Sequence, residues 1–269
     1  MGSQTPANVA SLPIVNYEAL INKDAAEISK LVHAAITVGM FYLDLRGATT
    51  SAFFEDISVT LETANDFFSL PQDSAEKTEA LRTGVERGYH YSPGSSYYEI
   101  PRDEFTRGTW PLPPTFGPQK ERLARTLQTF HSAVQTVLAE LCKAVDITIP
   151  ELNPDTTIPS DTALKLVYKP PIHDAGKVVS GAHTDFGLAT LLWYDEETTQ
   201  VSTHDDDNRQ TNIWQTIPVV EGCALVNVAD ELAARSGGKL HSTLHRVVAP
   251  PGAKRVQNGV LYLMRPGSA

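Results

Sequence analysis

The chain has 269 residues, of which 41% are hydrophobic and 20% charged, and its formal net charge is −10. This length suits one large domain, and the ordinary globular composition argues against long disordered segments. Nucleic acids and anionic membrane surfaces are excluded as expected partners, because the negative charge would repel both. We expect a cytoplasmic protein without a membrane segment, because the first ten residues lack the pattern of a signal peptide.

The first part of the chain favours helices. The segments "LPIVN" and "GMFYLDL" are typical of short strands, but apolar residues otherwise recur every three or four positions. This spacing predicts amphipathic helices whose apolar faces cover a core. The helical pattern extends over residues 21–35, 54–68 and 121–146. We therefore expect residues 1–160 to form a mostly helical N-terminal region.

The pattern changes at residue 161. Short segments rich in Val, Ile, Leu, Thr and Tyr follow one another, each bounded by Gly, Pro, Asn or Asp. Many short strands without long helices between them indicate an antiparallel sandwich or barrel. We expect residues 161–269 to form this β core, packed with the N-terminal region into one structural unit. Examples of these segments are "ALKLVY", "LATLLWY", "NIWQTI", "CALVNV", "TLHRVVA" and "VLYLM".

An aromatic stretch, "RGYHYSPGSSYYEIPRDEFTRGTW", occupies residues 87–110. It is interpreted as an irregular connection between helical segments. Long loops of this kind are often lids or binding loops. Two alternatives stay open: the rings form an aromatic lid over a binding site, or they cover the outside of the barrel.

The segment "SGAHTDFGLATLLWYD" contains a candidate metal site. On an extended strand, His183 and Asp185 point to the same face, about 7 Å apart, and can bind one ion. A third ligand is needed, and "KLHSTLHRVVAPPG" offers His241 and His245. About 13 Å separates these two on a strand, so one ion cannot bind both. We choose His245, which lies within the strand, and expect His241 beside the "SGG" turn to be solvated.

Two histidines and one carboxylate form the ligand set of non-haem Fe(II) oxygenases, which leave half of the coordination sphere open. The open positions receive a chelating cosubstrate and dioxygen. Thr184 and Phe186, which flank the first two ligands in sequence, are assigned to packing. The candidate metal ligands and catalytic residues are therefore His183, Asp185 and His245.

The ordered set of "LPIVN", "VGMFYL", "FFSLP", "RGYHYSPG", "HTDFGLATLL", "VNVADEL" and "SGGKLHSTLHRVVAPPG" resembles the iron(II)/2-oxoglutarate-dependent dioxygenases of the isopenicillin N synthase-like group. The resemblance implies a mainly β fold with flanking helices, whose core is a double-stranded β-helix (jelly roll). It also implies Fe(II) and 2-oxoglutarate as cofactors, with dioxygen as cosubstrate. Ten residues beyond the distal histidine this group has an arginine that holds the far carboxylate of 2-oxoglutarate, here Arg255.

The chain departs from the group at two positions near the expected 2-oxoglutarate site. Gln257 stands where relatives have a serine, and Lys169 stands where they have a tyrosine before the first proline of "LVYKPP". Tyr168 is one residue earlier, and a shift by one residue turns a strand side chain to the opposite face. Either Lys169 supplies a second cation for the carboxylate, or a local bulge restores Tyr168 to the site.

The implied reaction couples decarboxylation of 2-oxoglutarate to succinate with oxidation of a substrate C–H bond, by hydroxylation, desaturation, cyclisation or rearrangement. The expected substrate is a small natural product. The alternatives are an oxidase of the same group that does not use 2-oxoglutarate and a non-catalytic subunit of such an enzyme. Relatives generally continue past the last strand into helical residues that close over the site. Truncation, disorder beyond residue 269, and completion by a partner subunit or a second copy are the alternatives for this end.

Overall fold

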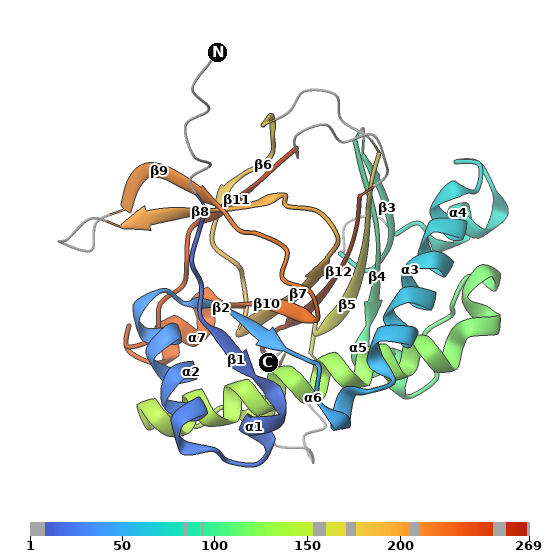
Figure 1. The fold of residues 1–269 in the computed structure, drawn as a ribbon. Coiled ribbons are helices and arrows are strands. Elements are labelled where there is room, and N and C mark those ends of the chain that lie inside the picture. Colours follow the sequence, from blue (N-terminus) through green and yellow to red (C-terminus); the bar gives the residue numbers. More distant parts are fainter. Residues whose placement is uncertain are drawn as a thin grey trace.

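The computed structural model describes residues 9–82, 86–92, 94–152, 160–170, 176–204, 210–249 and 257–267. A large sheet and a small sheet form the core, and helices cover the outer side of the large sheet (Figure 1). This arrangement confirms the predicted mainly β fold with flanking helices. No helix in these ranges is long and apolar enough to cross a membrane.

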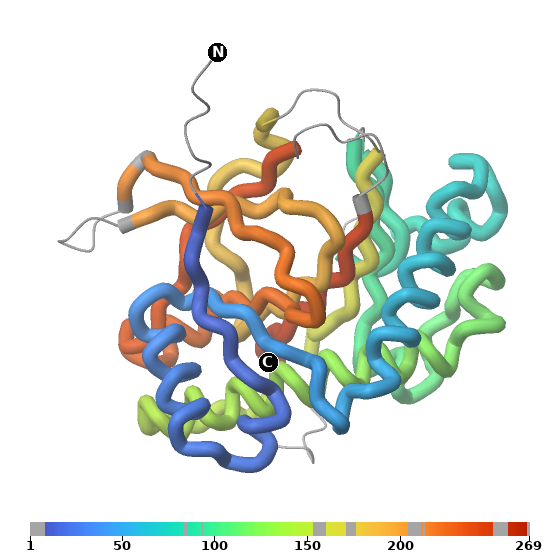
Figure 2. Tube along the Cα trace, viewed as in Figure 1, coloured from blue at the N-terminus to red at the C-terminus, as the bar shows by residue number. Residues whose placement is uncertain are grey.

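The large sheet has eight strands in the order β1-β2-β10-β7-β12-β5-β4-β3. Neighbouring strands pair antiparallel except β1 and β2, which are parallel. The blue β2 lies beside the orange β10 in Figure 2, so the two ends of the chain share one sheet. The strands are β1 (Ile14–Asn16), β2 (Met40–Asp44), β3 (Gly88–Ser92), β4 (Ser95–Pro101), β5 (Ala163–Lys169), β7 (Ala189–Tyr194), β10 (Cys223–Val228) and β12 (Gln257–Met264).

The small sheet has four antiparallel strands in the order β6-β11-β8-β9. The pairing of β11 with β6 contains irregularities, which bend this edge of the core. Together the two sheets form the double-stranded β-helix that the resemblance implied. The strands are β6 (Val178–His183), β8 (Thr199–His204), β9 (Gln210–Thr216) and β11 (His245–Val248).

Two of the three predicted helices, 54–68 and 121–146, begin and end within a residue of the predicted limits, whereas the predicted helix 21–35 is divided between α1 and α2. The 121–146 pattern corresponds to α6 (Lys120–Val145), which crosses the outer side of the large sheet. Asn16, Asp24 and Ser74 cap three helices by accepting a hydrogen bond from a backbone N–H of the first turn. The other helices are α1 (Tyr17–Ile21), α2 (Ala25–Thr37), α3 (Phe53–Ser69), α4 (Ala75–Ala80), α5 (Arg102–Thr106) and α7 (Asp230–Arg235).

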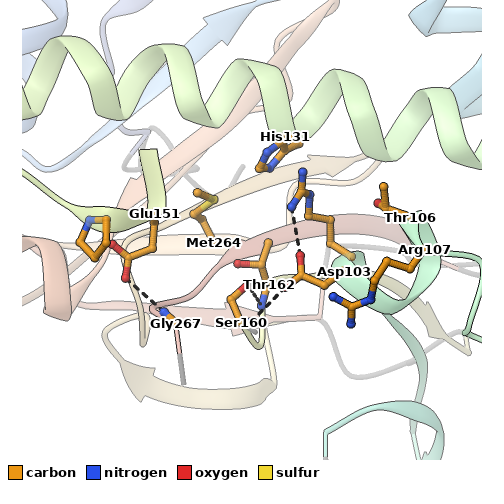
Figure 3. A pocket seen from close by; sticks show the side chains of 11 residues that line it. Asp103, Thr106, Arg107, His131, Glu151, Ser160, Thr162, Met264 and Gly267 are labelled. Atoms are coloured by element: carbon orange, nitrogen blue, oxygen red, sulfur yellow. Dashed lines mark hydrogen bonds and ion pairs between the residues drawn. The ribbon is translucent and has the colours of Figure 1, made fainter. Parts of the chain in front are cut away.

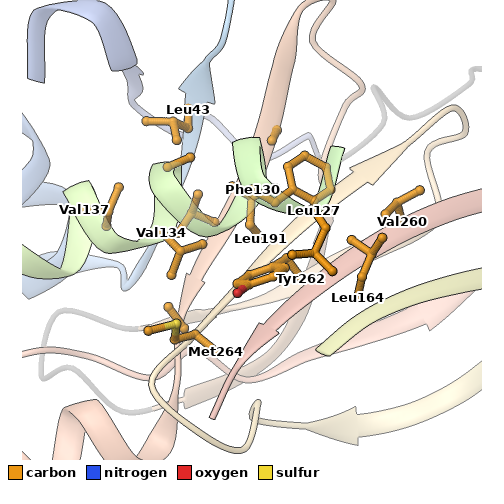
Figure 4. Close-up of a cluster of buried hydrophobic side chains, with 14 of the residues drawn as sticks. Leu43, Leu127, Phe130, Val134, Val137, Leu164, Leu191, Val260, Tyr262 and Met264 are labelled. Atoms are coloured by element: carbon orange, nitrogen blue, oxygen red, sulfur yellow. The ribbon is translucent and has the colours of Figure 1, made fainter. Parts of the chain in front are cut away.

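The main hydrophobic core lies between the helices and the outer face of the large sheet (Figure 4). Phe130 and Val134 of α6 are fully buried against this face. The strands contribute every second residue, because side chains alternate between the faces of a sheet. In β5, for example, Leu164 and Leu166 are fully buried in this core. The intervening residues face the space between the sheets and are available to build a site.

The prediction of an irregular loop over residues 87–110 is wrong. Residues 88–92 and 95–101 form the paired strands β3 and β4 at the edge of the large sheet, and α5 follows β4 directly. Tyr89 and Tyr98 are buried and lie against Phe67 of α3, with ring centroids 5.5 and 5.4 Å apart. Most of these rings therefore belong to the core rather than to a lid. The Gly- and Ser-rich turn hid the strand pattern, because such residues are typical of loops.

Candidate metal centre

The three predicted ligand side chains lie close together beside strands β6 and β11 of the small sheet. His183 ends β6, His245 begins β11, and the two are directly paired across the strands. Their Nε2 atoms lie 4.0 and 3.5 Å from Oδ1 of Asp185. All three ligand atoms lie within 4.8 Å of one another, and this is the one such cluster within the ranges that the structure describes. The structure thus brings together the three predicted ligands.

The local geometry differs from the predicted one in one respect. Asp185 is not on the strand with His183, because β6 ends at His183 and the chain then turns. Gly187 has φ of +104°, and a Cβ there would lie 2.8 Å from the backbone oxygen of Met264. Only glycine adopts this conformation at such a close approach without strain. The turn at Gly187 follows Asp185 and leads into β7, and the carboxylate of Asp185 lies beside both histidines.

Backbone carbonyls orient both imidazole rings. Nδ1 of His183 lies 2.7 Å from the oxygen of Gly181, and Nδ1 of His245 lies 3.0 Å from that of Thr243. A carbonyl only accepts, so each Nδ1 carries the proton and donates it. Each Nε2 is then left with a lone pair that faces the centre of the cluster, which is the common arrangement of histidine ligands.

The donor set fits ferrous iron. Two imidazole nitrogens and one carboxylate oxygen can occupy one face of an octahedral ion and leave the other positions open. Asp185 presents Oδ1 to the histidines while its Oδ2 accepts a hydrogen bond of 2.9 Å from Nδ2 of Asn227. His183 and Asp185 are only partly buried, so ligands can reach this centre from a cavity.

The cavity beside the cluster has a volume of about 670 Å³. One wall is polar: Thr190 and Asn227 are neighbours across β7 and β10, and both are almost fully buried. Within the described part of the chain, neither Oγ1 of Thr190 nor Oδ1 of Asn227 has a hydrogen-bond partner. The rest of the lining is mixed. It includes charged residues such as Lys177 and Glu196, and the apolar residues Val167, Val178, Val179, Leu192, Val247 and Leu261.

Lys169 lines this cavity, whereas Tyr168 does not. The pairing of β5 with β4 and β12 is unbroken, so no bulge restores Tyr168 to the site. Tyr168 points to the helical side, where its ring lies 5.3 Å from that of Phe68. Burial lowers the pKa of Lys169 to about 8. No hydrogen bond or ion pair of Lys169 is found among the described residues, so this cation is available to an anionic ligand.

The other predicted residues are distributed as follows. Arg255 lies outside the described residues, and of Gln257 only the backbone is described, paired with Lys169. His241, which was expected to be solvated, is partly exposed, but its Nε2 is buried. Phe186 does not pack in the core either, since 69% of its surface is exposed. Asn227 was not singled out from the sequence, although it belongs to the quoted "VNVADEL".

A second, smaller cavity of about 180 Å³ lies on the helical side of the large sheet (Figure 3). It contains none of the predicted ligands. His131 of α6 is buried there, and its Nδ1 shares a 2.6 Å hydrogen bond with the hydroxyl of Tyr262. Burial lowers the pKa of His131 to about 4, so this imidazole is neutral at pH 7. Because the metal ligands line only the larger cavity, this smaller cavity is separate from the cluster of ligands.

Comparison with known proteins decides the family. The family model of the 2OG-Fe(II) oxygenase superfamily matches residues 160–262, a range that contains all three ligands. A second model, the N-terminal domain of non-haem dioxygenases in morphine synthesis, matches residues 12–113. The chain belongs to the 2OG-Fe(II) oxygenase superfamily. It is an Fe(II)/2-oxoglutarate-dependent dioxygenase, and His183, Asp185 and His245 are the residues that would hold the iron.

Similar dioxygenases occur in fungi and plants. The 2-oxoglutarate-dependent dioxygenase frbH of Dothideomycetidae sp. is 28% identical over 98% of this chain and 85% of its own length. Kihadalactone A synthase of Citrus sinensis is 25% identical over 97% of this chain and 84% of its own length. The crystal structure of the rice dioxygenase for auxin oxidation has a TM-score of 0.73 with 18% identity, covering 95% and 84% of the two chains. This last likeness shows a shared fold.

Proposed function

We propose that this dioxygenase oxidises a C–H bond of a small specialised metabolite, and that Lys169 binds the distal carboxylate of 2-oxoglutarate. The observation that carries the proposal is one cavity that contains the ligand cluster and an unpaired lysine together. Iron held by His183, Asp185 and His245 would supply the oxidising chemistry that couples 2-oxoglutarate and dioxygen to the C–H bond. The protein contributes the positions of the reactants.

The size and lining of the cavity support a small organic substrate. Sites for such ligands usually have volumes of 300–1,000 Å³ and apolar walls with few polar groups. The volume of this cavity lies within that range, and valines and leucines are among its lining residues. The Citrus relative is named after a single plant product, kihadalactone A, which agrees with a metabolite as substrate of the group.

The position of Lys169 supports its role as the carboxylate anchor. 2-Oxoglutarate must chelate the metal with its keto-acid end and extend its other carboxylate away from the metal. Lys169 occurs near the end of β5, whereas Asn227 and Thr190 are beside the metal ligands. An ammonium that has no protein partner in a partly buried site gains a charge-assisted hydrogen bond when the carboxylate arrives. Arg255, which the resemblance assigns to the same carboxylate, remains part of the proposal.

The proposal is tested by oxygen-dependent succinate formation with Fe(II), 2-oxoglutarate and a panel of fungal and plant metabolites. We expect a turnover signal with the correct substrate class and its loss in Asp185→Ala. Asp66→Asn, which changes an exposed carboxylate of α3 that does not line the cavity, should retain it. Full succinate formation by Asp185→Ala would contradict the assignment of the metal centre. A failure confined to the metabolite panel would contradict only the substrate class.

A further inference from the structure

The segment from Asn227 to Asp230, within "VNVADEL", contacts Asp185 through both a side chain and the backbone. Asn227 is 4% exposed, and its Nδ2 donates to Oδ2 of Asp185 over 2.9 Å. Because a carboxylate oxygen only accepts, this contact requires the amide nitrogen on the Asp185 side. The backbone N–H of Asp230 donates to the backbone oxygen of Asp185, also over 2.9 Å.

The hydrogen bond from Asn227 distinguishes the two oxygens of the Asp185 carboxylate. Oδ2 is engaged by the amide, and Oδ1 is left facing the Nε2 atoms of His183 and His245. A carboxylate without this contact could rotate and present either oxygen, or both, to a metal ion. The amide therefore selects a single oxygen ligand, and this leaves the remaining positions of the ion open.

The carboxylate of Asp230 joins the two segments that carry the ligands. Oδ2 accepts a 2.8 Å hydrogen bond from the hydroxyl of Thr184, which lies between His183 and Asp185 in the chain. Oδ1 accepts a 2.6 Å hydrogen bond from the hydroxyl of Ser242. Ser242 directly precedes Thr243, whose carbonyl orients the ring of His245. One side chain thus connects the loop of the first two ligands to the segment of the third.

We propose that Asn227 and Asp230 are positioning residues that preorganise the metal site: Asn227 fixes the oxygen that Asp185 presents, and Asp230 fixes the spacing of the two ligand segments. The inference rests on the proposed metal centre. Removing groups that orient metal ligands typically weakens metal binding ~10–100-fold. Asn227 should have the larger effect, because its contact is buried, whereas Asp230 is exposed and water can replace its hydrogen bonds.

The test is a titration of the metal-free full-length protein with Co(II), which reports both affinity and ligand geometry through its visible absorption. We expect Asn227→Ala to bind Co(II) ~30-fold more weakly, with an altered spectrum, and Asp230→Asn about fivefold more weakly. Thr190→Val is the matched control for Asn227. It removes a buried hydroxyl from the same wall of the cavity, and this hydroxyl makes no hydrogen bond to Asp185. Glu231→Gln is the control for Asp230, since Glu231 pairs with Arg235.

The outcomes separate this inference from the metal centre itself. Failure of the wild-type protein to bind Co(II) would overturn the centre and the inference together. Normal affinity and spectrum in both Asn227→Ala and Asp230→Asn would overturn the inference alone, and so would an equal loss in the two controls. Urea unfolding of each metal-free variant guards against a merely structural effect. If Asn227→Ala does not fold, the spectrum and Co(II) affinity of Asp230→Asn decide whether the inference stands.

Discussion

The two faces of the large sheet are built from the same strands but differ in the side chains that they carry. Along β5, Leu164 and Leu166 point to the helices and are fully buried, whereas Val167 and Lys169 point into the cavity. The helical face buries its large side chains in one continuous core. The cavity face instead carries the ammonium of Lys169 and the polar atoms of Thr190 and Asn227, for which the described residues offer no partner. Strand alternation thus lets one element serve stability on one side and binding on the other.

The largest effect on stability should come from removing a large side chain from the core on the helical face. Phe130→Ala removes a fully buried ring between α6 and the sheet, so it should reduce the free energy of unfolding by about 4 kcal/mol. Urea denaturation measures this loss. The Michaelis constant for 2-oxoglutarate should stay unchanged in the folded fraction. A large change in that constant would show that the two faces are not independent.

On the cavity face, Lys169→Met should weaken 2-oxoglutarate binding without reducing stability. The substitution keeps an unbranched chain but removes the cation, so the Michaelis constant for 2-oxoglutarate should rise about 100-fold, equivalent to about 3 kcal/mol. The free energy of unfolding should not fall, because the lysine has no partner among the described residues. Steady-state succinate formation measures the first quantity and urea denaturation the second. An unchanged Michaelis constant would remove Lys169 from the binding site.

The pH dependence of 2-oxoglutarate binding should report the same cation. Burial lowers the pKa of Lys169 to about 8, so the ammonium is present below this pH and is lost above it. The Michaelis constant for 2-oxoglutarate should therefore rise about tenfold from pH 7 to pH 9. In Lys169→Met this rise should disappear. The unfolded chain binds this proton up to its ordinary value of 10.5, so the same group should make stability increase with pH between about 8 and 10.5.

The smallest effect is expected for Tyr168→Phe. Tyr168 faces α3 rather than the cavity, and the strand pairing excludes a bulge that would turn it. Loss of its hydroxyl should alter the Michaelis constant for 2-oxoglutarate by less than about twofold. An increase in this constant comparable to that of Lys169→Met would mean that Tyr168 faces the cavity in solution.

The sequence predicted the features that depend on local pattern. The spacing of apolar residues placed α3 and α6 to within a residue, because a helix that covers a sheet needs a continuous apolar stripe. The three ligands were also predicted, and His183 and His245 prove to be direct strand partners. The hairpin β3–β4 was missed, because its turn has loop-like composition and its pairing is set by contact with β5.

The supporting residues could not be predicted, because they depend on contacts between distant parts of the chain. Asn227 lies 42 residues from Asp185, and Asp230 lies 46 residues from Thr184. An asparagine inside an apolar strand is a weak signal that a buried polar contact exists, but it does not name the partner. Likewise, only the register of β5 against its neighbours shows that Lys169, and not Tyr168, faces the cavity.

The most direct test of the central claim is a titration of the anaerobic Fe(II) protein with 2-oxoglutarate, followed by visible absorption. If His183, Asp185 and His245 hold iron with adjacent positions open, bidentate chelation by the keto acid should produce a charge-transfer band that saturates at one equivalent. The band should be absent in Asp185→Ala and in His245→Ala. A wild-type protein that binds Fe(II) yet gives no band, or a variant that gives the full band, would contradict the account.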